Sequence, residues 1–234
     1  MYGFDAKTGE ERWSTPASGF SNVWGTPALA DGEKGKEIVV AVPEETWAIS
    51  TETGKLRWMA PGNGGGSHSI VISDGFAYSI GGSRGGASAV AIKLGGSEEI
   101  DEAEWEQRAA SRFATPVVHN GRIYSVARDA VACYDASNGE EVYQQRLPAK
   151  LGGGGGARRG RFGGQSYASP VIAGENLIVT DVGGTVYVVK TGDEFKVVST
   201  NDMTFDKSGF NGTPAISDGN MFIRSNTHLY CIGE

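Results

Sequence analysis

Apolar and polar residues alternate in short runs along this chain, and residues that favour turns separate the runs. The clearest copy of the pattern has runs at residues 115–119, 122–127, 130–134 and 140–146. Alternation with a period of two predicts β-strands with one buried face, and the Asn120-Gly121 pair between the first two runs is a strong hairpin signal. We therefore predict four antiparallel strands here, following one another up and down one sheet.

One segment of the pattern, a Thr-Pro or Ser-Pro step followed by apolar residues and a turn, recurs along the chain. The copies span residues 26–32, 69–75, 115–121, 169–174 and 213–219, and Ile70 replaces the proline in the second copy. Measured at the proline position, successive copies lie 43, 46, 54 and 44 residues apart. A period in this range with four short strands per unit indicates the blades of a β-propeller. We predict an all-β fold of about five four-stranded antiparallel blades, with the short, uncharged first strand of each blade innermost.

The repeat also predicts where each blade lies and leaves the closure of the ring open. Blades are expected at residues 22–60, 67–107, 111–147, 166–200 and 211–234 plus 1–16, within a single domain over residues 1–234. The last blade lacks a fourth strand, which Glu10–Ser14 is expected to supply by pairing with the C-terminal blade. However, Tyr2–Asp5 aligns with Tyr230–Gly233, so both termini offer a third strand to one blade. The ring is either closed in this way, an excerpt of a seven- or eight-bladed ring, or completed by another copy of the chain.

Composition and charge narrow the class of protein. The chain has 36 glycines, as expected where tight turns join many short strands. Its net charge of −7 argues against a nucleic-acid partner, because such proteins usually carry a basic face. No run approaches the roughly 20 apolar residues of a membrane helix. Met1 leads directly into a strand pattern without a signal peptide, so we expect a soluble chain with no membrane span.

Two sets of residues are predicted to be structural. Cys133 and Cys231 occupy the same place in blades two steps apart, farther than the roughly 7 Å that a disulfide allows between Cα atoms. Both are expected to be small buried thiols without a disulfide. A second set sits at the Asp-Gly and Asn-Gly turns, where positive φ is expected. Its members are Asp31, Asp74, Asn120 and Asp218.

Two further segments resemble a known repeat. Residues 5–13, Asp-Ala-Lys-Thr-Gly-Glu-Glu-Arg-Trp, and residues 50–58, Ser-Thr-Glu-Thr-Gly-Lys-Leu-Arg-Trp, are similar to the tryptophan-docking repeat of the pyrroloquinoline-quinone-like, or quinoprotein-type, β-propellers. In that family the Trp of one blade packs against the Gly-containing turn of the next. The resemblance implies a structural role for Trp13, Trp58 and Trp105. The pattern is weaker elsewhere, since Asn138-Gly139 leads to Tyr143 instead of Trp.

The resemblance implies several possible functions. The family includes quinone-dependent dehydrogenases and non-catalytic relatives such as the propeller lipoprotein of the outer-membrane β-barrel assembly machinery. The dehydrogenases carry adjacent cysteines and a Ca²⁺ site, and this chain has no Cys-Cys pair. We expect no enzymatic activity, no cofactor and no metal, and a bacterial protein of the periplasm or cell exterior. A quinone- or metal-dependent oxidoreductase is the alternative, and a propeller fragment that self-assembles without an independent function is a third reading.

The blade pattern predicts one face on which a binding site would lie. Turns between second and third strands emerge there, together with the crossings from each fourth strand to the next first strand. The polar residues expected on this face are Glu44, Glu45, His68, Arg84, Arg112, Arg128, Asp129, Arg158, Arg159, Arg161, Asp181, Asn226 and His228. Cationic residues gathered on one face of an acidic protein favour an anionic ligand or an acidic protein partner.

From this face we select seven candidate ligand-binding residues: His68, Arg84, Arg128, Arg158, Arg159, Arg161 and His228. Three of the arginines lie in a glycine-rich insertion, residues 151–165, which is either a flexible basic arm for a partner or a solvated loop. The pair His68 and His228 lacks further metal ligands, and His119 lies on the opposite face. The sequence thus predicts a non-enzymatic binding or scaffolding propeller that engages a protein or small anionic ligand, as a monomer or a self-completing homo-oligomer.

Overall fold

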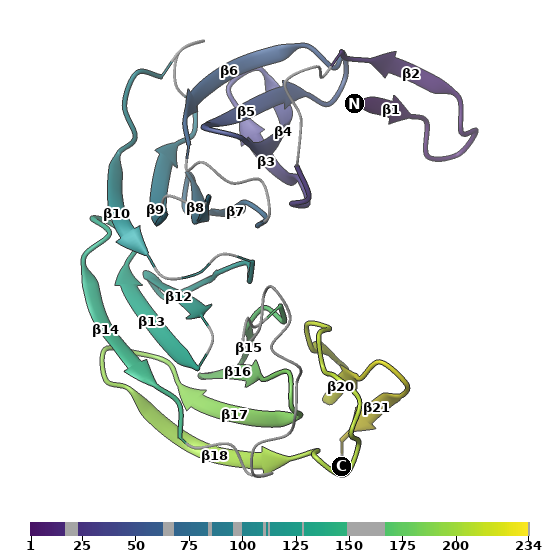
Figure 1. The fold of residues 1–234 in the computed structure, drawn as a ribbon. Helices are drawn as coiled ribbons and strands as arrows, with labels where there is room; N and C mark the ends of the chain where they lie inside the picture. Colours follow the sequence, from purple (N-terminus) through teal and green to yellow (C-terminus); the bar gives the residue numbers. More distant parts are fainter. Residues whose placement is uncertain are drawn as a thin grey trace. The chain divides into compact units, whose positions relative to one another are not determined.

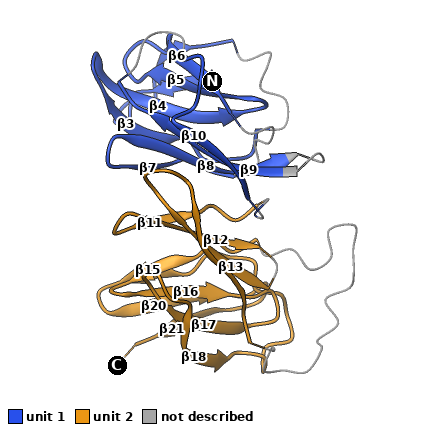
Figure 2. Cartoon of the chain, turned by 90° about the vertical axis from the view of Figure 1, so that its left-hand side faces the viewer, with its two compact units in different colours: residues 1–112 blue, residues 113–234 orange. Residues whose placement is uncertain are grey.

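The computed structural model describes residues 1–16, 23–62, 68–83, 86–95, 100–109, 111, 113–127, 129–148 and 167–233. These residues form β-strands, turns and irregular segments without a helix, and the strands make six antiparallel sheets (Figure 1). The chain divides into two compact units, residues 1–112 and residues 113–234 (Figure 2). The predicted all-β class is confirmed. The single domain over residues 1–234 stays a prediction.

Unit 1 contains a two-stranded hairpin and two four-stranded sheets. The hairpin pairs β1 (Tyr2–Phe4) with β2 (Glu11–Ser14). The first full sheet contains β3 (Ala28–Gly32), β4 (Gly35–Val42), β5 (Glu45–Ser50) and β6 (Leu56–Pro61). The second contains β7 (Val71–Ser73), β8 (Phe76–Ser83), β9 (Gly86–Lys93) and β10 (Trp105–Ala109).

Unit 2 contains two four-stranded sheets and one three-stranded sheet. The first is formed by β11 (Val117–His119), β12 (Arg122–Ala127), β13 (Ala130–Asp135) and β14 (Glu141–Arg146). The second is formed by β15 (Val171–Ala173), β16 (Asn176–Thr180), β17 (Thr185–Lys190) and β18 (Lys196–Asp202). The third is formed by β19 (Ala215–Ser217), β20 (Asn220–Arg224) and β21 (Leu229–Ile232). Strands pair with their neighbours in chain order in every sheet, so each has the up-and-down order predicted for a blade.

Within each unit, the first strands of successive sheets lie next to each other, as β3 does with β7 and β11 with β15. The Thr or Ser that opens each repeat connects them. The Thr26 amide donates to Ser69 Oγ at 2.9 Å in unit 1. In unit 2 the Thr115 amide donates to Ser169 Oγ at 2.9 Å, and the Ser169 amide donates to Thr213 Oγ1 at 3.0 Å. The repeated hydroxyl therefore satisfies a backbone donor of the preceding sheet.

Apolar residues fill the space between successive sheets of a unit. In unit 1, Val39, Ala48 and Trp58 of one sheet pack against Ile92 and neighbouring residues of the next. In unit 2, a matching cluster joins the sheets β11–β14 and β15–β18. Its buried members are Tyr124, Val126, Val131, Cys133, Tyr143, Leu147, Leu177, Val179, Tyr187 and Val189. The middle strands of each complete sheet carry buried apolar residues on both sides, such as Ile123 and Tyr124 of β12.

Two predictions about local structure are corrected. Asp74, Asn120 and Asp218 have the expected positive φ, but Asp31 does not, because β3 extends to Gly32 and Gly35 takes the positive φ of that turn. Cys133 is buried as predicted, whereas Cys231 is exposed, and both thiols are free. No following sheet covers Cys231 among the described residues of unit 2.

The predicted pairing of Glu10–Ser14 with the C-terminal blade would join residues of different units and stays a prediction. Strand β2 pairs with β1, and the C-terminal sheet keeps three strands. The hairpin has the geometry of the third and fourth strands of a blade. Its register shifts after the Gly3–Trp13 pair, as the β5–β6 register shifts after Ala48–Trp58. The hairpin therefore forms the outer half of a blade in its own right.

Candidate functional site

Most of the predicted basic face lies outside the described residues. This holds for Arg84, Arg112, Arg128, Arg158, Arg159 and Arg161, and for the insertion at residues 151–165. Their role in binding stays a prediction. Of the seven candidate residues, the structure describes His68 and His228, and it places them in very different surroundings.

His68 is a core residue in this structure, 1% exposed. Its Nε2 lies 2.6 Å from Ser79 Oγ, and a Cβ added at Gly81 would lie 1.9 Å from its Nδ1. Burial lowers the pKa of His68 to about 4, because the imidazolium would lose its hydration. The side chain is therefore neutral at pH 7, and its burial does not support a role in contacting a partner.

His228 lies at the surface, at the edge of a polar cluster centred on Asp206. Its Nδ1 is 2.9 Å from Thr227 Oγ1 and 3.5 Å from Asp206 Oδ2. Asp206 Oδ2 also accepts hydrogen bonds from Ser225 Oγ at 2.6 Å and from Tyr230 OH at 2.8 Å. These donors hold the pKa of Asp206 well below its usual range, with the Ser225 hydroxyl as the largest cause. The carboxylate stays ionised, and the hydrogen-bond partner of the His228 imidazole beside it is Thr227 Oγ1.

Backbone hydrogen bonds join the turns and crossings of unit 2 on the predicted face. The Asn226 amide donates to the Gly209 carbonyl at 2.9 Å, and the Phe210 amide donates to the Val182 carbonyl at 3.1 Å. In the sheet β19–β21, the turn between the second and third strands is hydrogen-bonded to the crossing that precedes the first strand. The same crossing is hydrogen-bonded to the corresponding turn of the neighbouring sheet, β15–β18. This confirms for unit 2 that turns and crossings emerge on the same side.

The crossings carry exposed aromatic side chains that the sequence reasoning missed. Trp24 in unit 1 is 72% exposed and Tyr167 in unit 2 is 43% exposed. Tyr167 packs against Phe113, with ring centroids 5.3 Å apart. All three lie two residues before the Thr or Ser that opens a repeat, at Thr26, Ser169 and Thr115. A comparison of that position across the repeats would have found them.

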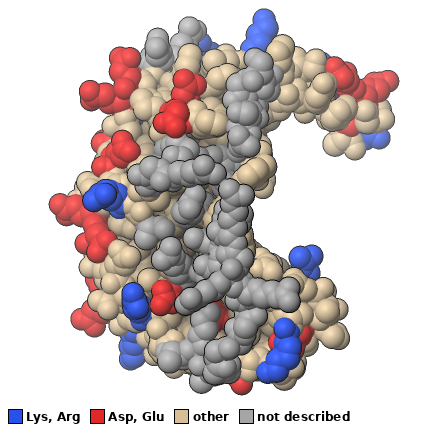
Figure 3. Space-filling view, in the orientation of Figure 1, with Lys and Arg blue, Asp and Glu red and all other residues tan. Residues whose placement is uncertain are grey.

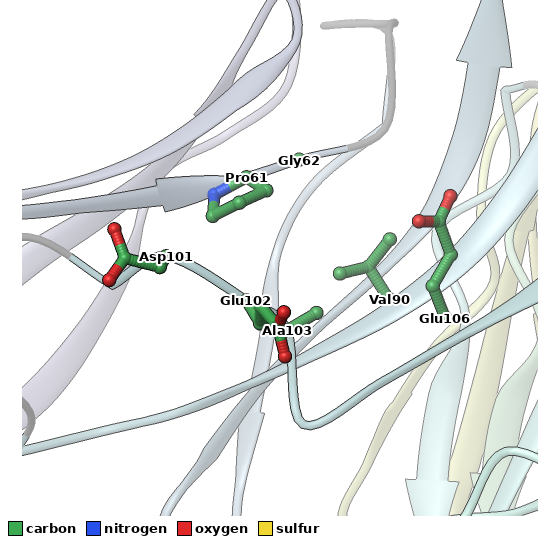
Figure 4. Close-up of a pocket in the computed structure, with 7 residues that line it drawn as sticks. All are labelled: Pro61, Gly62, Val90, Asp101, Glu102, Ala103 and Glu106. Carbon is green, nitrogen blue, oxygen red and sulfur yellow. The ribbon is translucent and has the colours of Figure 1, made fainter.

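A second surface feature is an acidic hollow of about 290 Å³ in unit 1. It is lined by Pro61, Gly62, Val90, Asp101, Glu102, Ala103 and Glu106 (Figure 4). Glu106 comes from β10 and Val90 from β9, while Asp101 and Glu102 come from the segment before β10. Carboxylates also gather along this side of the unit (Figure 3). Among the described residues, no group of three or more His, Cys, Asp or Glu side chains is arranged to hold a metal ion.

Trp13 contacts the turn of the following sheet. Its Nε1 donates to the Thr51 carbonyl at 2.9 Å, and Thr15 Oγ1 donates to the Gly54 carbonyl at 2.5 Å. Gly54 has a φ of +69°, and a Cβ added there would lie 2.4 Å from Cε3 of Trp13. A glycine is therefore required for the ring to lie against this turn. Trp58 differs, because its Nε1 donates to Glu37 Oε1 at 3.0 Å within its own sheet.

Comparisons with solved structures give the class of fold. BamB from Moraxella catarrhalis matches with a TM-score of 0.53 and 14% identity, over 97% of this chain and 76% of that one. The quinohemoprotein alcohol dehydrogenase ADHIIG from Pseudomonas putida HK5 matches with a TM-score of 0.64 and 16% identity, over 95% of this chain and 42% of that one. The computationally designed protein Ika4 matches with a TM-score of 0.56 and 13% identity, over 79% of this chain and 99% of that one. These likenesses and the six antiparallel sheets define a β-propeller protein.

The sequence gives the family. The family described as outer membrane protein assembly factor BamB matches residues 1–127 and 86–194. The chain therefore belongs to this family of pyrroloquinoline-quinone-like propeller repeats, as the repeat pattern predicted. A search of curated proteins finds no match.

Proposed function

We propose that this protein is a non-enzymatic propeller module that binds a protein partner through the face formed by its turns and crossings. The observation that carries the proposal is the exposure of Trp24 and Tyr167 at equivalent places in two repeats. An exposed ring loses contact with water when a partner covers it, and its rigidity keeps the entropy cost low. Trp and Tyr are accordingly enriched among the residues that contribute most to protein interfaces.

Polar residues expected on the same face are suited to the rim of such an interface. His228 offers an exposed imidazole in unit 2, with Thr227 as its hydrogen-bond partner. The predicted basic residues Arg112, Arg158, Arg159 and Arg161 lie close to Phe113 and Tyr167 in the sequence. In the proposal, apolar contact comes from the rings, and the arginines favour an acidic partner surface.

Membership of the assembly-factor family makes a protein of the outer-membrane assembly pathway the favoured partner. The same membership favours the periplasm or cell exterior as the location. No helix in the described part of the chain is long and apolar enough to cross a membrane. We also propose that the contact of Trp13 with the Gly54 turn is the docking interaction of the family repeat.

A photo-crosslinking amino acid placed at residues 24 and 167 tests this function in cells of the source organism. We expect a discrete protein adduct from both positions. Leu56 and Val198, which are 41% and 54% exposed on outer strands, provide matched control positions. Equal adducts from the control positions, or none from residues 24 and 167, would overturn the assignment of the face.

A quinoprotein-type oxidoreductase is the second candidate, favoured by the structural likeness to the alcohol dehydrogenase. The residues of this chain do not fit its cofactor site as the resemblance describes it. The only cysteines are Cys133, buried in β13, and Cys231, exposed in β21, so no adjacent pair exists. Titration of the purified protein with pyrroloquinoline quinone and Ca²⁺ separates the two candidates, because saturable binding would favour the oxidoreductase.

A further inference from the structure

His68 occupies a position that small residues fill in the other repeats. It directly precedes the Ser that opens its repeat, and the residues at this position elsewhere are Gly25, Ala114, Ala168 and Gly212. In the strand register, Gly81 of β8 corresponds to Ala127 of β12. A Cβ at Gly81 would lie 1.9 Å from His68 Nδ1, so the missing Cβ makes the space that the ring occupies.

The backbone of His68 contacts the crossing that carries Trp24. A Cβ added at Gly25 would lie 2.0 Å from the carbonyl oxygen of His68, so the two backbones are in direct contact. The next residue, Thr26, donates its amide hydrogen to Ser69 Oγ at 2.9 Å. Trp24 directly precedes Gly25 and presents its ring to solvent. Residues 68 and 69 are therefore the support against which the Trp24 crossing packs.

The surroundings of the His68 ring suit only its neutral form. Its Nε2 lies 2.6 Å from Ser79 Oγ, and its Nδ1 has no hydrogen-bond partner among the described residues. A second proton would make both nitrogens donors and leave a buried, charged N–H without an acceptor, which is costly. Ser79, Gly81 and Gly25 are not ionisable, and burial is the only cause that lowers the pKa of His68. No neighbouring carboxylate therefore compensates for the added charge.

We infer that His68 is a positioning residue for Trp24: its neutral ring holds the crossing in place, and protonation of the ring lets the crossing open. The inference rests on the proposed function, because it gives His68 control of one contact on the partner-binding face. The corresponding support of the Tyr167 crossing is Gly212 and Thr213, since the Ser169 amide donates to Thr213 Oγ1. This support contains no titratable side chain, so acid should weaken binding at Trp24 and leave Tyr167 unaffected.

Amide hydrogen exchange measured by NMR detects the opening of the crossing without a partner. If His68 regains its ordinary pKa of 6.5 when the crossing opens, the opening equilibrium should rise about 20-fold between pH 7 and pH 5. The protection factor of the Thr26 amide should fall by the same ratio. The Thr115 amide, which donates to Ser169 Oγ beside Ala168, is the matched control and should keep its protection factor. A constant protection factor at Thr26 would overturn the inference.

Two variants separate the position of the ring from its protonation. Gly81→Ala places a Cβ where the ring lies, so the protection factor of the Thr26 amide should fall at least about tenfold already at pH 7. His68→Ala combined with Gly81→Ala reproduces the Ala114 and Ala127 pair of the next repeat, so this variant should fold like the parent. Its Thr26 amide should be equally protected at pH 7 and pH 5. An acid response that persists in the double variant would contradict the assignment to His68.

Crosslinking connects His68 to partner binding. In lysates of the source organism, the adduct from residue 24 should decrease at least about tenfold between pH 7 and pH 5, while the adduct from residue 167 should not change. A constant adduct from residue 24, or equal decreases at both positions, would overturn the role of His68 in binding. The absence of any adduct at pH 7 would contradict the proposed function instead, and the Thr26 amide would still report whether His68 holds the crossing.

Discussion

Aromatic side chains serve differently at the junctions between sheets and at the crossings before first strands. At the junctions, Trp13 and Tyr124 place a polar atom on a turn of the next sheet, Trp13 on the Thr51 carbonyl and Tyr124 OH on the Gly192 amide at 2.7 Å. At the crossings, Trp24 and Tyr167 present their rings to solvent. A buried aromatic residue needs a partner for its polar atom, whereas an exposed one can bond to water. The difference separates residues that hold the fold from residues available to a partner.

The largest effect is expected from Trp13→Ala. The substitution removes the packing of the ring against Gly54 and the hydrogen bond to Thr51, and we expect it to cost about 2–4 kcal/mol at this junction. Because Trp13 anchors the hairpin β1–β2 to the Gly54 turn, residues 1–16 should exchange amide hydrogens much faster while unit 2 is unchanged. Hydrogen exchange with mass spectrometry measures both. Unchanged protection of residues 1–16 would contradict the role of Trp13, and Trp24→Ala is the control.

His68 lies in a crossing but is buried, and we expect its burial to make the stability of the protein depend on pH. Its pKa is lowered from 6.5 to about 4 by burial, so the native state favours the neutral ring. The stability that His68 contributes is complete above pH 6.5 and is lost as the pH falls toward 4, by about 3 kcal/mol in total. Urea unfolding at pH 7, 5.5 and 4.5 measures the loss. A His68→Gln variant should show a smaller loss than the parent, and His119→Gln, at the end of β11, should not.

Two Tyr→Phe substitutions in one unit should differ in their effect. Tyr124→Phe removes the acceptor of the Gly192 amide and should cost about 1–2 kcal/mol. Tyr143 is buried beside Phe195, and its hydroxyl has no hydrogen-bond partner within the described residues. Tyr143→Phe should therefore leave stability unchanged or raise it by up to about 1 kcal/mol. Equal losses of unfolding free energy in the two variants would show that hydrogen bonding does not distinguish the two tyrosines.

The smallest effect on stability is expected at the crossings. Trp24→Ala removes a ring that is largely solvated, and Tyr167→Ala removes one that is partly exposed, so we expect changes within about 0.5 and about 1 kcal/mol in thermal or urea unfolding. Binding to the crosslinked partner should nevertheless fall at least tenfold. A large loss of unfolding free energy in either variant would show that the ring it lacks stabilises the fold.

The repeat made most of the fold predictable. Strands expected at 122–127 and 130–134 appear as Arg122–Ala127 and Ala130–Asp135, because alternation and the Asn120-Gly121 turn act locally. The turn near Asp31 was misplaced by two residues, since both Gly32 and Gly35 can accommodate it and only the strand register decides between them. The exposure of Cys231 depends on whether another sheet covers it, and the residues around Cys231 in the sequence do not determine this.

The candidate site was less predictable for a physical reason. His68 and His228 look alike in the sequence, yet one is enclosed by Gly81 and Ser79 while the other lies at the surface beside Thr227. Burial of a single side chain depends on residues that are distant in the chain. Exposed rings such as Trp24 present the same problem, because Trp58 in the same unit is a core residue.

The exchange rates of the tryptophan indole N–H groups, measured by NMR, test this account most directly. Trp13 and Trp58 donate their indole hydrogens to Thr51 and Glu37, so both should exchange slowly. Trp24 should exchange at nearly the rate of free tryptophan until a partner binds, and should then slow. Rapid exchange at Trp13, or slow exchange at Trp24 in the isolated protein, would contradict the division between structural and partner-binding aromatic residues.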